Sequence, residues 1–316
     1  MKTIVAAALV CLAIALALPL LLAPGAAPEG PSATPGADAE TVFTVLMDGE
    51  VHTVDMASYL PGVVAAEMPA LFEPDALKAQ AVAARSFILS RTRTVNANHP
   101  EADVCTDPGC CKAYATEDEL REKWGADFDA YWQKMLAAVR ETDGQYLSYE
   151  GEPIFAAFHS SSAGMTEDAG AVWNALPYLV SVPSPEEAED VPDYVTTVSY
   201  TDGEFAARLR EGYPYISLAS DSAAWVEDVA LDESGRVASV TVCGQEIPGT
   251  EMRTLFELRS TAFTLEHGEG GFTFTVTGYG HGVGMSQYGA NVLAGLGTPY
   301  EDILAHYYPG TELIMG

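Results

Sequence analysis

Basic residues are scarce in this chain of 316 residues, which has 15 Lys and Arg against 45 Asp and Glu and a formal net charge of −30. Nucleic-acid binding depends on Lys and Arg that neutralise phosphates, so this balance argues against a nucleic-acid partner. It argues equally against electrostatic docking on anionic lipid. The charge is typical of a soluble acidic surface and implies no particular partner.

Long apolar runs are also scarce: one extends from Ile4 to about Ala23, and no second spanning segment is evident. Roughly twenty apolar residues can cross a bilayer as a helix, so residues 1–23 predict a single-pass anchor in the cell membrane, with a cleaved signal peptide and a secreted protein as the alternative. Residues 24–40 are rich in Pro, Gly, Ala and Ser and predict a flexible linker. Residues 41–316 are then the extracytoplasmic domain.

Cysteine is rare as well, with five residues, three of them close together. His99, Cys105, Cys110 and Cys111 offer one imidazole and three thiolates, a set that suits tetrahedral zinc. A site closed by four protein ligands is structural rather than catalytic. The alternative is a Cys105–Cys110 disulfide that leaves Cys111 free, because the compartment beyond a membrane is oxidising.

One carboxylate, Glu67, lies in an almost wholly apolar stretch with Val63, Val64, Met68 and Leu71. Burial disfavours the charged form of a carboxyl and raises its pKa, and a carboxyl that stays protonated near neutral pH can serve as a general acid. No second carboxylate lies in an equally apolar motif. The alternative is a carboxylate at a helix end, paired with a nearby cation.

A helix is predicted shortly after Glu67, beginning at Pro74, where a missing N–H is harmless. Its apolar face is formed by Leu77, Ala81, Ala84 and Ile88. Lys78 and Arg85 stand seven residues apart and share another face. They are either solvated helix charges or cations that face a substrate.

The remaining patterns predict both helices and strands. A hairpin with an Asp48-Gly49 turn is predicted over residues 41–54, an N-cap at Asp55, one helix over 116–142, two strands within 146–158, and a last helix over 300–309. Residues 178–266 contain strand-like runs that predict an inserted β-rich subdomain. The expected class is α+β, with mixed helices and antiparallel strands around the central helix that follows Glu67.

Two further segments carry polar chemistry. His159 is followed by three serines, but a hydrolase triad needs three groups that converge in space, which neighbours in sequence do not show. Residues 277–290 hold His281 among four closely spaced glycines, which allow close approach of the backbone. No Lys follows in a P-loop arrangement, so nucleotide binding is rejected.

Together these blocks resemble the stage II sporulation protein D family. The resemblance rests on Tyr59-Leu60-x-Gly62-Val63-Val64-x-x-Glu67-Met68-Pro69 running into Ala76–Arg85, on His159–Gly164 with Ala163 in place of the family's first Gly, on Gly278–Ala290, and on Tyr300–Pro309. It extends over about residues 41–314. The family consists of lytic transglycosylases of peptidoglycan.

The resemblance implies that Glu67 is catalytic and that the bond between N-acetylmuramic acid and N-acetylglucosamine is cleaved without water, leaving 1,6-anhydro ends. The substrate-binding residues that we expect are Lys78, Arg85, His159, Ser160, Ser161, His281, Gln287 and Tyr288. Some family members have a zinc site where His99, Cys105, Cys110 and Cys111 stand, which implies a structural zinc and no cofactor for the chemistry.

The resemblance also implies a role in remodelling the wall during engulfment of the forespore, on peptidoglycan strands stripped of stem peptides. The implied partners are a sporulation amidase and a membrane anchor protein. Two alternatives stay open: a wall-binding scaffold without activity, and a zinc-dependent amidase or peptidase with Glu67 as base, which would need an open metal position.

Overall fold

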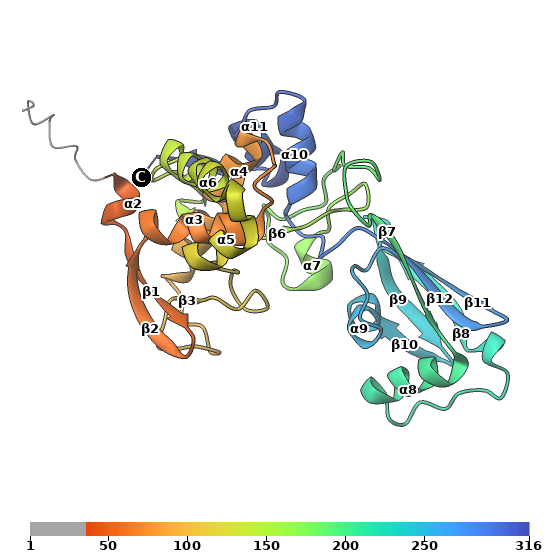
Figure 1. The fold of residues 1–316 in the computed structure, drawn as a ribbon. Coiled ribbons are helices and arrows are strands. Elements are labelled where there is room, and N and C mark those ends of the chain that lie inside the picture. Colours follow the sequence, from red (N-terminus) through yellow and green to blue (C-terminus); the bar gives the residue numbers. More distant parts are fainter. Residues whose placement is uncertain (1–35, 316) are drawn as a thin grey trace, which may run out of the picture. The chain divides into compact units, whose positions relative to one another are not determined.

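The computed structural model describes residues 36–315 of the chain (Figure 1). The predicted membrane segment and most of the predicted linker lie outside the described residues. Within residues 36–315, no helix is both long enough and apolar enough to cross a membrane. This part combines helices with mainly antiparallel sheets around two hydrophobic cores, which confirms the predicted α+β class.

The first strands form the predicted hairpin. β1 (Val42–Met47) pairs antiparallel with β2 (Glu50–Asp55), and Asp48 and Gly49 turn between them with φ angles of 52° and 81°. Two consecutive positive φ angles define a type I′ turn, which explains why an Asp-Gly pair stands there. β3 (Val104–Cys105) joins β1 in parallel and thereby attaches the cysteine segment to this sheet.

Helix α4 (Pro74–Arg91) is the centre of the larger core. It begins at Pro74 as predicted, and nearly all its side chains from Ala76 to Ile88 are buried. The elements packed against it include α3 (Met56–Glu67), α6 (Phe128–Glu141), α10 (Gln287–Gly295), α11 (Tyr300–Tyr307) and β4 (Tyr146–Tyr149). Since the helix is enclosed on all sides, alanines serve at many positions where a larger side chain would not fit.

Local signals set the ends of the neighbouring helices. Asp55 is the N-cap of α3 as predicted, and its carboxylate accepts a hydrogen bond from the N–H of Ser58 at 2.8 Å. The single helix predicted over residues 116–142 is wrong, because α5 (Glu117–Trp124) ends at a 3₁₀ turn, Gly125–Asp127, before α6 begins. Gly125 has a φ of 53°, which a right-handed helix cannot continue.

The smaller core lies within residues 195–277. One antiparallel sheet contains β8 (Val226–Leu231), β9 (Val237–Val242) and β10 (Gln245–Pro248), and another contains β7 (Val195–Tyr200), β11 (Phe263–Gly268) and β12 (Gly271–Thr277). Helices α8 (Asp202–Gly212) and α9 (Gly249–Leu255) and the short turn Ser222–Ala224 complete it. Phe205 stacks on Phe272 with 3.8 Å between ring centroids. The β-rich insertion is therefore present, and it extends past residue 266 because β12 pairs with both β7 and β11.

Short strands bring distant parts of the chain together. The remaining elements are β5 (Glu152–Pro153), β6 (Phe158–His159), α7 (Ala169–Val172), β13 (Met285–Ser286) and β14 (Glu312–Ile314). β4 and β5 are joined by a turn at Glu150 and Gly151, and β14 pairs with β4. β6 pairs in parallel with β13, so that Phe158 lies beside Met285 and His159 beside Ser286. This pairing places the serine-rich segment next to the glycine-rich segment.

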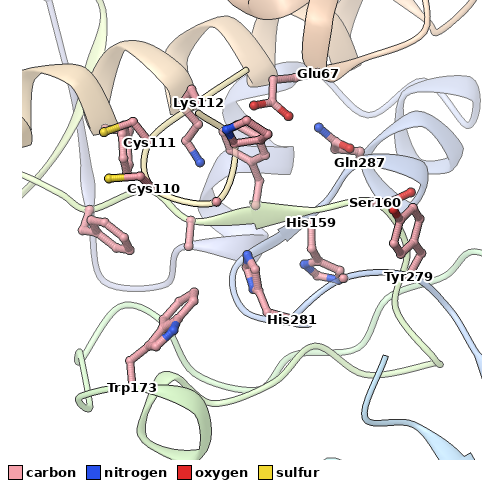
Figure 2. A pocket seen from close by; sticks show the side chains of 17 residues that line it. Glu67, Cys110, Cys111, Lys112, His159, Ser160, Trp173, Tyr279, His281 and Gln287 are labelled. Carbon is pink, nitrogen blue, oxygen red and sulfur yellow. The ribbon is translucent and has the colours of Figure 1, made fainter. Parts of the chain in front are cut away.

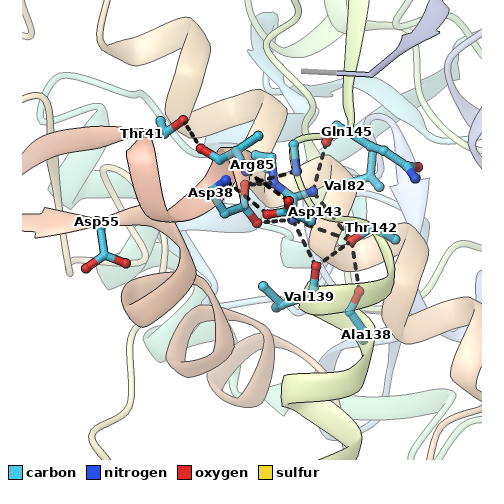
Figure 3. Close-up of polar contacts among 12 residues, drawn as sticks. Asp38, Thr41, Asp55, Val82, Arg85, Ala138, Val139, Thr142, Asp143 and Gln145 are labelled. Carbon is cyan, nitrogen blue, oxygen red and sulfur yellow. Dashed lines mark hydrogen bonds and ion pairs between the residues drawn. The ribbon is translucent and has the colours of Figure 1, made fainter. Parts of the chain in front are cut away.

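A buried ion pair ties the start of the folded part to α4 (Figure 3). Short helix α2 (Ala37–Glu40) carries Asp38, whose carboxylate accepts hydrogen bonds from Nε and Nη2 of Arg85 at 2.7 and 2.6 Å. Each of the two residues is 1% exposed. The Arg85 Nη1 also donates to the carbonyl of Gln145 at 2.8 Å. Residues 36–40, which the sequence analysis assigned to the linker, are therefore joined to the larger core by this ion pair.

Replacement of Asp38 by Asn is expected to lower the free energy of unfolding by about 3–5 kcal/mol, because Arg85 would stay buried without its anionic partner. Chemical denaturation measures this difference. Glu40→Gln is the matched control, since it removes a carboxylate from the same helix but at an exposed position, and it should change stability by less than about 0.5 kcal/mol. Equal losses in both variants would contradict the role assigned to the ion pair.

Candidate functional site

Glu67 is the last residue of α3 and precedes the turn into α4. Its side chain is half-buried, and Oε1 accepts a hydrogen bond from the backbone N–H of Ala113 at 3.0 Å. Burial raises the pKa of the Glu67 carboxyl above its ordinary value of 4.5, while the Lys112 ammonium and the Ala113 N–H oppose this shift. The negative end of the helix dipole also disfavours a carboxylate at this position. Glu67 therefore retains its proton to a higher pH than a carboxyl in water does.

A cavity of about 400 Å³ opens beside Glu67 (Figure 2). Its lining includes five polar residues of the predicted site region, which are Glu67, His159, Ser160, His281 and Gln287, together with the aromatic residues Trp173 and Tyr279. Their elements come from every third of the chain: α3, β6, the glycine-rich loop and the start of α10. The structure thus assembles one polar cavity from the three predicted motifs.

The glycine-rich loop reaches the cavity because its glycines adopt φ angles that other residues avoid. Gly280 and Gly284 have φ angles of 115° and 71°. A Cβ on Gly284 would lie 2.1 Å from the carbonyl oxygen of Ala157, and one on Gly280 would lie 2.8 Å from the Cβ of His159. The loop can therefore approach β6 this closely only with glycine at these positions. Ala163, which replaces a family glycine, is not among the described residues with positive φ.

Both histidines of the cavity are neutral. Burial lowers the pKa of His281 to about 3, with the nearby cation Lys112 acting in the same direction. Burial also lowers the pKa of His159 well below its ordinary value. His281 Nδ1 accepts a hydrogen bond from the Val283 N–H at 3.0 Å, so its proton is on Nε2. His159 lies between the Val283 carbonyl at 3.2 Å and the Ser162 hydroxyl at 2.7 Å. Neither imidazole can supply charge, and both ring nitrogens of His159 already have protein partners, whereas the Nε2–H of His281 can donate to a ligand.

Two other predicted residues lie close by but do not line the cavity. Ser161 is buried, and its hydroxyl has no hydrogen-bond partner among the described residues. Tyr288 packs its ring against Phe72, with 4.9 Å between centroids. Gln287 does line the cavity, and its amide nitrogen donates to Gln80 Oε1 at 3.3 Å. The spacing of residues within the motifs does not predict which of them line the cavity, because adjacent side chains point to different sides of the backbone.

Lys78 and Arg85, predicted to bind substrate, lie away from the cavity. The Lys78 ammonium is 2.9 Å from the Glu141 carboxylate and 3.7 Å from that of Asp75. Arg85 is held by Asp38, as described above. The face of α4 that carries both cations packs against α6, which explains why neither reaches the cavity that contains Glu67.

Lys112 is a charged residue of the cavity that the sequence analysis did not identify. Its Nζ lies 3.5 Å from the ring centroid of Phe158 and 4.4 Å from that of Phe87. Burial lowers the pKa of Lys112 to about 8, although the Glu67 carboxylate acts in the opposite direction. The signal in the sequence that could have identified Lys112 was its position directly after Cys110 and Cys111. We interpreted that segment as a metal site alone.

Glu67 also lines a second cavity of about 400 Å³. Its lining includes Trp124 and Tyr131, whose rings meet edge to face with 5.6 Å between centroids, and the exposed side chain of Leu71. Trp124 and Tyr131, which are partly buried against the larger core, thus also face this cavity. Glu67 therefore lines two cavities of similar size.

The four predicted metal ligands lie together. One donor atom from each of His99, Cys105, Cys110 and Cys111 is within 4.8 Å of the others. His99 Nδ1 is 2.9 Å from the carbonyl oxygen of Ala102, so its N–H donates there and Nε2 keeps a lone pair for a metal. Three thiols and one oriented imidazole fit a tetrahedral zinc with no open position.

Residues 48–149, which include Glu67, α4 and the cysteine cluster, match the family model described as stage II sporulation protein. Stage II sporulation protein D of Bacillus amyloliquefaciens is 38% identical to this chain over 265 residues, covering 83% of this chain and 75% of the relative. The protein of the same name from Bacillus subtilis (strain 168) is 37% identical over 266 residues, with the same coverage.

A more distant relative is the amidase enhancer of Bacillus subtilis (strain 168), which is 29% identical over 302 residues and covers 80% of this chain and 40% of the relative. The chain belongs to the stage II sporulation protein D family. This confirms the family resemblance and associates the protein with the cell wall in sporulation.

Removal of the Glu67 charge is expected to stabilise the folded protein at pH 7. Because the folded-state pKa of Glu67 is raised, the folded protein holds this proton more tightly than the unfolded chain, and stability falls as the pH rises above the unfolded value of about 4.3. Glu67→Gln should therefore raise the Tm at pH 7. The gain should disappear below about pH 4, where the carboxyl is protonated in both states.

Thermal unfolding of the wild type and the variant across this pH range measures the effect. Glu73→Gln is the matched control, since it removes a carboxylate from an exposed position six residues away. An equal gain in the control would mean that general charge repulsion in this acidic chain, and not burial of Glu67, is responsible.

Proposed function

We propose that the protein is a lytic transglycosylase that cleaves between N-acetylmuramic acid and N-acetylglucosamine in the glycan strands of peptidoglycan and leaves 1,6-anhydro ends. The observation that carries the proposal is the position of Glu67, a half-buried carboxyl with a raised pKa that lines two cavities. A strand that occupied both cavities would present one glycosidic bond to this carboxyl.

Glu67 acts in turn as general acid and general base. The protonated carboxyl gives its proton to the glycosidic oxygen as the bond from C1 to that oxygen breaks. The C6 hydroxyl of the muramic acid then bonds to C1 and returns its proton to Glu67, so no water is consumed. Among the described residues that line the two cavities, Glu67 is the single carboxylate. This supports a one-carboxyl reaction over hydrolysis, which normally needs two.

Neutral polar groups and aromatic rings suit a sugar ligand. The His281 Nε2–H, the Ser160 hydroxyl and the Gln287 amide can bond with hydroxyl and N-acetyl groups without introducing charge. The aromatic side chains available for contact with the apolar faces of sugar rings are Trp173 and Tyr279 in one cavity and Trp124 and Tyr131 in the other. These residues bind and orient the strand, while Glu67 alone moves the proton.

We further propose that His99, Cys105, Cys110 and Cys111 hold a structural zinc. The metal would fix the loop whose next residues, Lys112 and Ala113, contact the end of α3. It takes no part in the chemistry, because four protein ligands leave no position for water or substrate. The same closed set disfavours a zinc-dependent amidase or peptidase.

The proposed setting is the mother-cell membrane, where the domain faces the wall during engulfment of the forespore. Residues 1–23 would provide the membrane attachment. An amidase that strips stem peptides and a membrane anchor protein are the proposed partners, and the name of the relative called amidase enhancer supports the link to amidases. The net charge of −30 would repel the carboxylates of intact stem peptides.

Glu67→Gln is expected to reduce cleavage of peptide-stripped glycan by about 10²–10⁴-fold, because the general acid is lost while the shape of the side chain is kept. The measurement is the mass of the released fragments, which identifies anhydro ends in the wild-type reaction. Glu73→Gln, at an exposed position outside both cavities, should retain full activity.

The products separate the alternatives. Reducing ends in place of anhydro ends would mean hydrolysis and a second carboxylate in the reaction. Release of peptides would indicate an amidase or peptidase, and binding of glycan without any cleavage would indicate a wall-binding scaffold. Full activity of Glu67→Gln would rule out the proposed mechanism.

The zinc proposal predicts about one zinc per chain, lost in Cys105→Ser together with a lower Tm, since a structural zinc contributes folding free energy. Metal analysis of the purified protein measures both variants against the wild type. Cys243→Ser is the matched control, because Cys243 is a free cysteine outside the cluster. A wild-type protein without zinc and with a Cys105–Cys110 disulfide, detected by mass spectrometry, would overturn the proposal.

A further inference from the structure

Among residues 36–315, Lys112 is a cation that forms no ion pair. No described carboxylate lies within the 4.0 Å of its Nζ that defines an ion pair, whereas Lys78, Arg85 and Arg236 each have one. Other described cations, such as Arg91 and Lys134, also lack an ion pair, but Lys112 differs from them because it lines the cavity beside Glu67. The carboxylate that acts on its charge there is the more distant Glu67.

The surroundings of Lys112 direct its charge into the cavity. Its Nζ rests against the ring faces of Phe158 and Phe87, which hold the end of the side chain in place without neutralising it. Figure 2 shows the amino group of Lys112 extending into the space between Glu67 and His281. Of the described residues that line this cavity, Lys112 is the single Lys or Arg, and the histidines are neutral.

A half-buried ammonium that lacks a counter-ion favours an anionic ligand, because the ligand replaces lost hydration with a charge-assisted hydrogen bond. In a glycan strand, muramic acid carries a lactyl ether beside the ring. The lactyl carboxyl is a neutral amide where a stem peptide is attached, and it is a free carboxylate where the peptide has been removed. A carboxylate is thus present near the scissile bond only in stripped glycan.

We propose that Lys112 binds the free lactyl carboxylate of the muramic acid that lies next to Glu67, and that it thereby selects stripped over peptide-bearing strands. The inference rests on the proposed function, since it assumes that glycan occupies the cavity. It assigns to Lys112 a role in recognition, separate from the proton transfer at Glu67. This selection acts at short range. The acidic surface repels the carboxylates of stem peptides from a distance, whereas Lys112 binds the lactyl carboxylate that becomes free when a stem peptide is removed.

The test uses the full-length Glu67→Gln protein, which binds glycan without degrading it. Two probes are compared at one pH: a stripped strand of alternating N-acetylglucosamine and N-acetylmuramic acid, and the same strand with each lactyl carboxylate converted to a methylamide. The Glu67→Gln protein should bind the carboxylate strand at least about tenfold more tightly, as expected for a hydrogen bond to a charged group. Equal affinity of the Glu67→Gln protein for the two strands would by itself overturn the proposal, before any variant of Lys112 is measured.

Addition of Lys112→Gln should remove the preference by weakening binding of the carboxylate strand alone, with affinity for the methylamide strand unchanged. Lys112→Arg should restore the preference, because it restores the charge. Arg210→Gln is the matched control: it removes one positive charge from an exposed position on α8, and it should leave the preference intact. Thermal unfolding confirms that each variant is folded.

A preference that survives Lys112→Gln in the folded protein would assign recognition of the carboxylate to another group and overturn the inference alone. Absence of binding to either strand would instead overturn the proposed function, and the inference with it. The two failures are therefore distinguishable.

Discussion

The parallel pairing of β6 with β13 is the constraint on which the site depends. It places His159 beside Ser286 and lets His159 contact the backbone of Val283, 124 residues further along the chain. Such a pairing requires the two backbones to approach without obstruction, and glycines in the second segment make this possible. The segment between the two strands, residues 160–284, includes the smaller core and must therefore begin and end close to this strand pair.

The cavity that results contains very little charge. Glu67 and Lys112 are its charged groups among the described residues, and its other polar side chains include neutral imidazole, hydroxyl and amide groups. Burial acts on both in the same sense, since it favours the uncharged form of each. Apart from Glu67, none of the described carboxylates of this acidic protein lines the cavity.

Much of this was predictable from the sequence, for reasons that are local. The Asp48-Gly49 turn, the Asp55 cap and the start of α4 at Pro74 follow from the backbone preferences of those residues. The roles of Arg85 and Lys112 were not predictable, because each depends on a partner far away in sequence. The sequence alone allowed Arg85 to be a surface cation, because its partner Asp38 lies far away on α2. It assigned Lys112 to the cysteine segment, because Glu67, which acts on Lys112 in the structure, is distant in sequence.

Three consecutive residues carry three different tasks. Cys111 belongs to the cluster of proposed metal ligands, Lys112 provides the cation of the cavity, and the N–H of Ala113 donates a hydrogen bond to Glu67. Because these three residues are consecutive, the length of the segment is fixed. An insertion or a deletion of one residue here would displace all three at once, whereas single substitutions change one at a time. The length of this segment is therefore more tightly constrained than the identity of any one of its side chains.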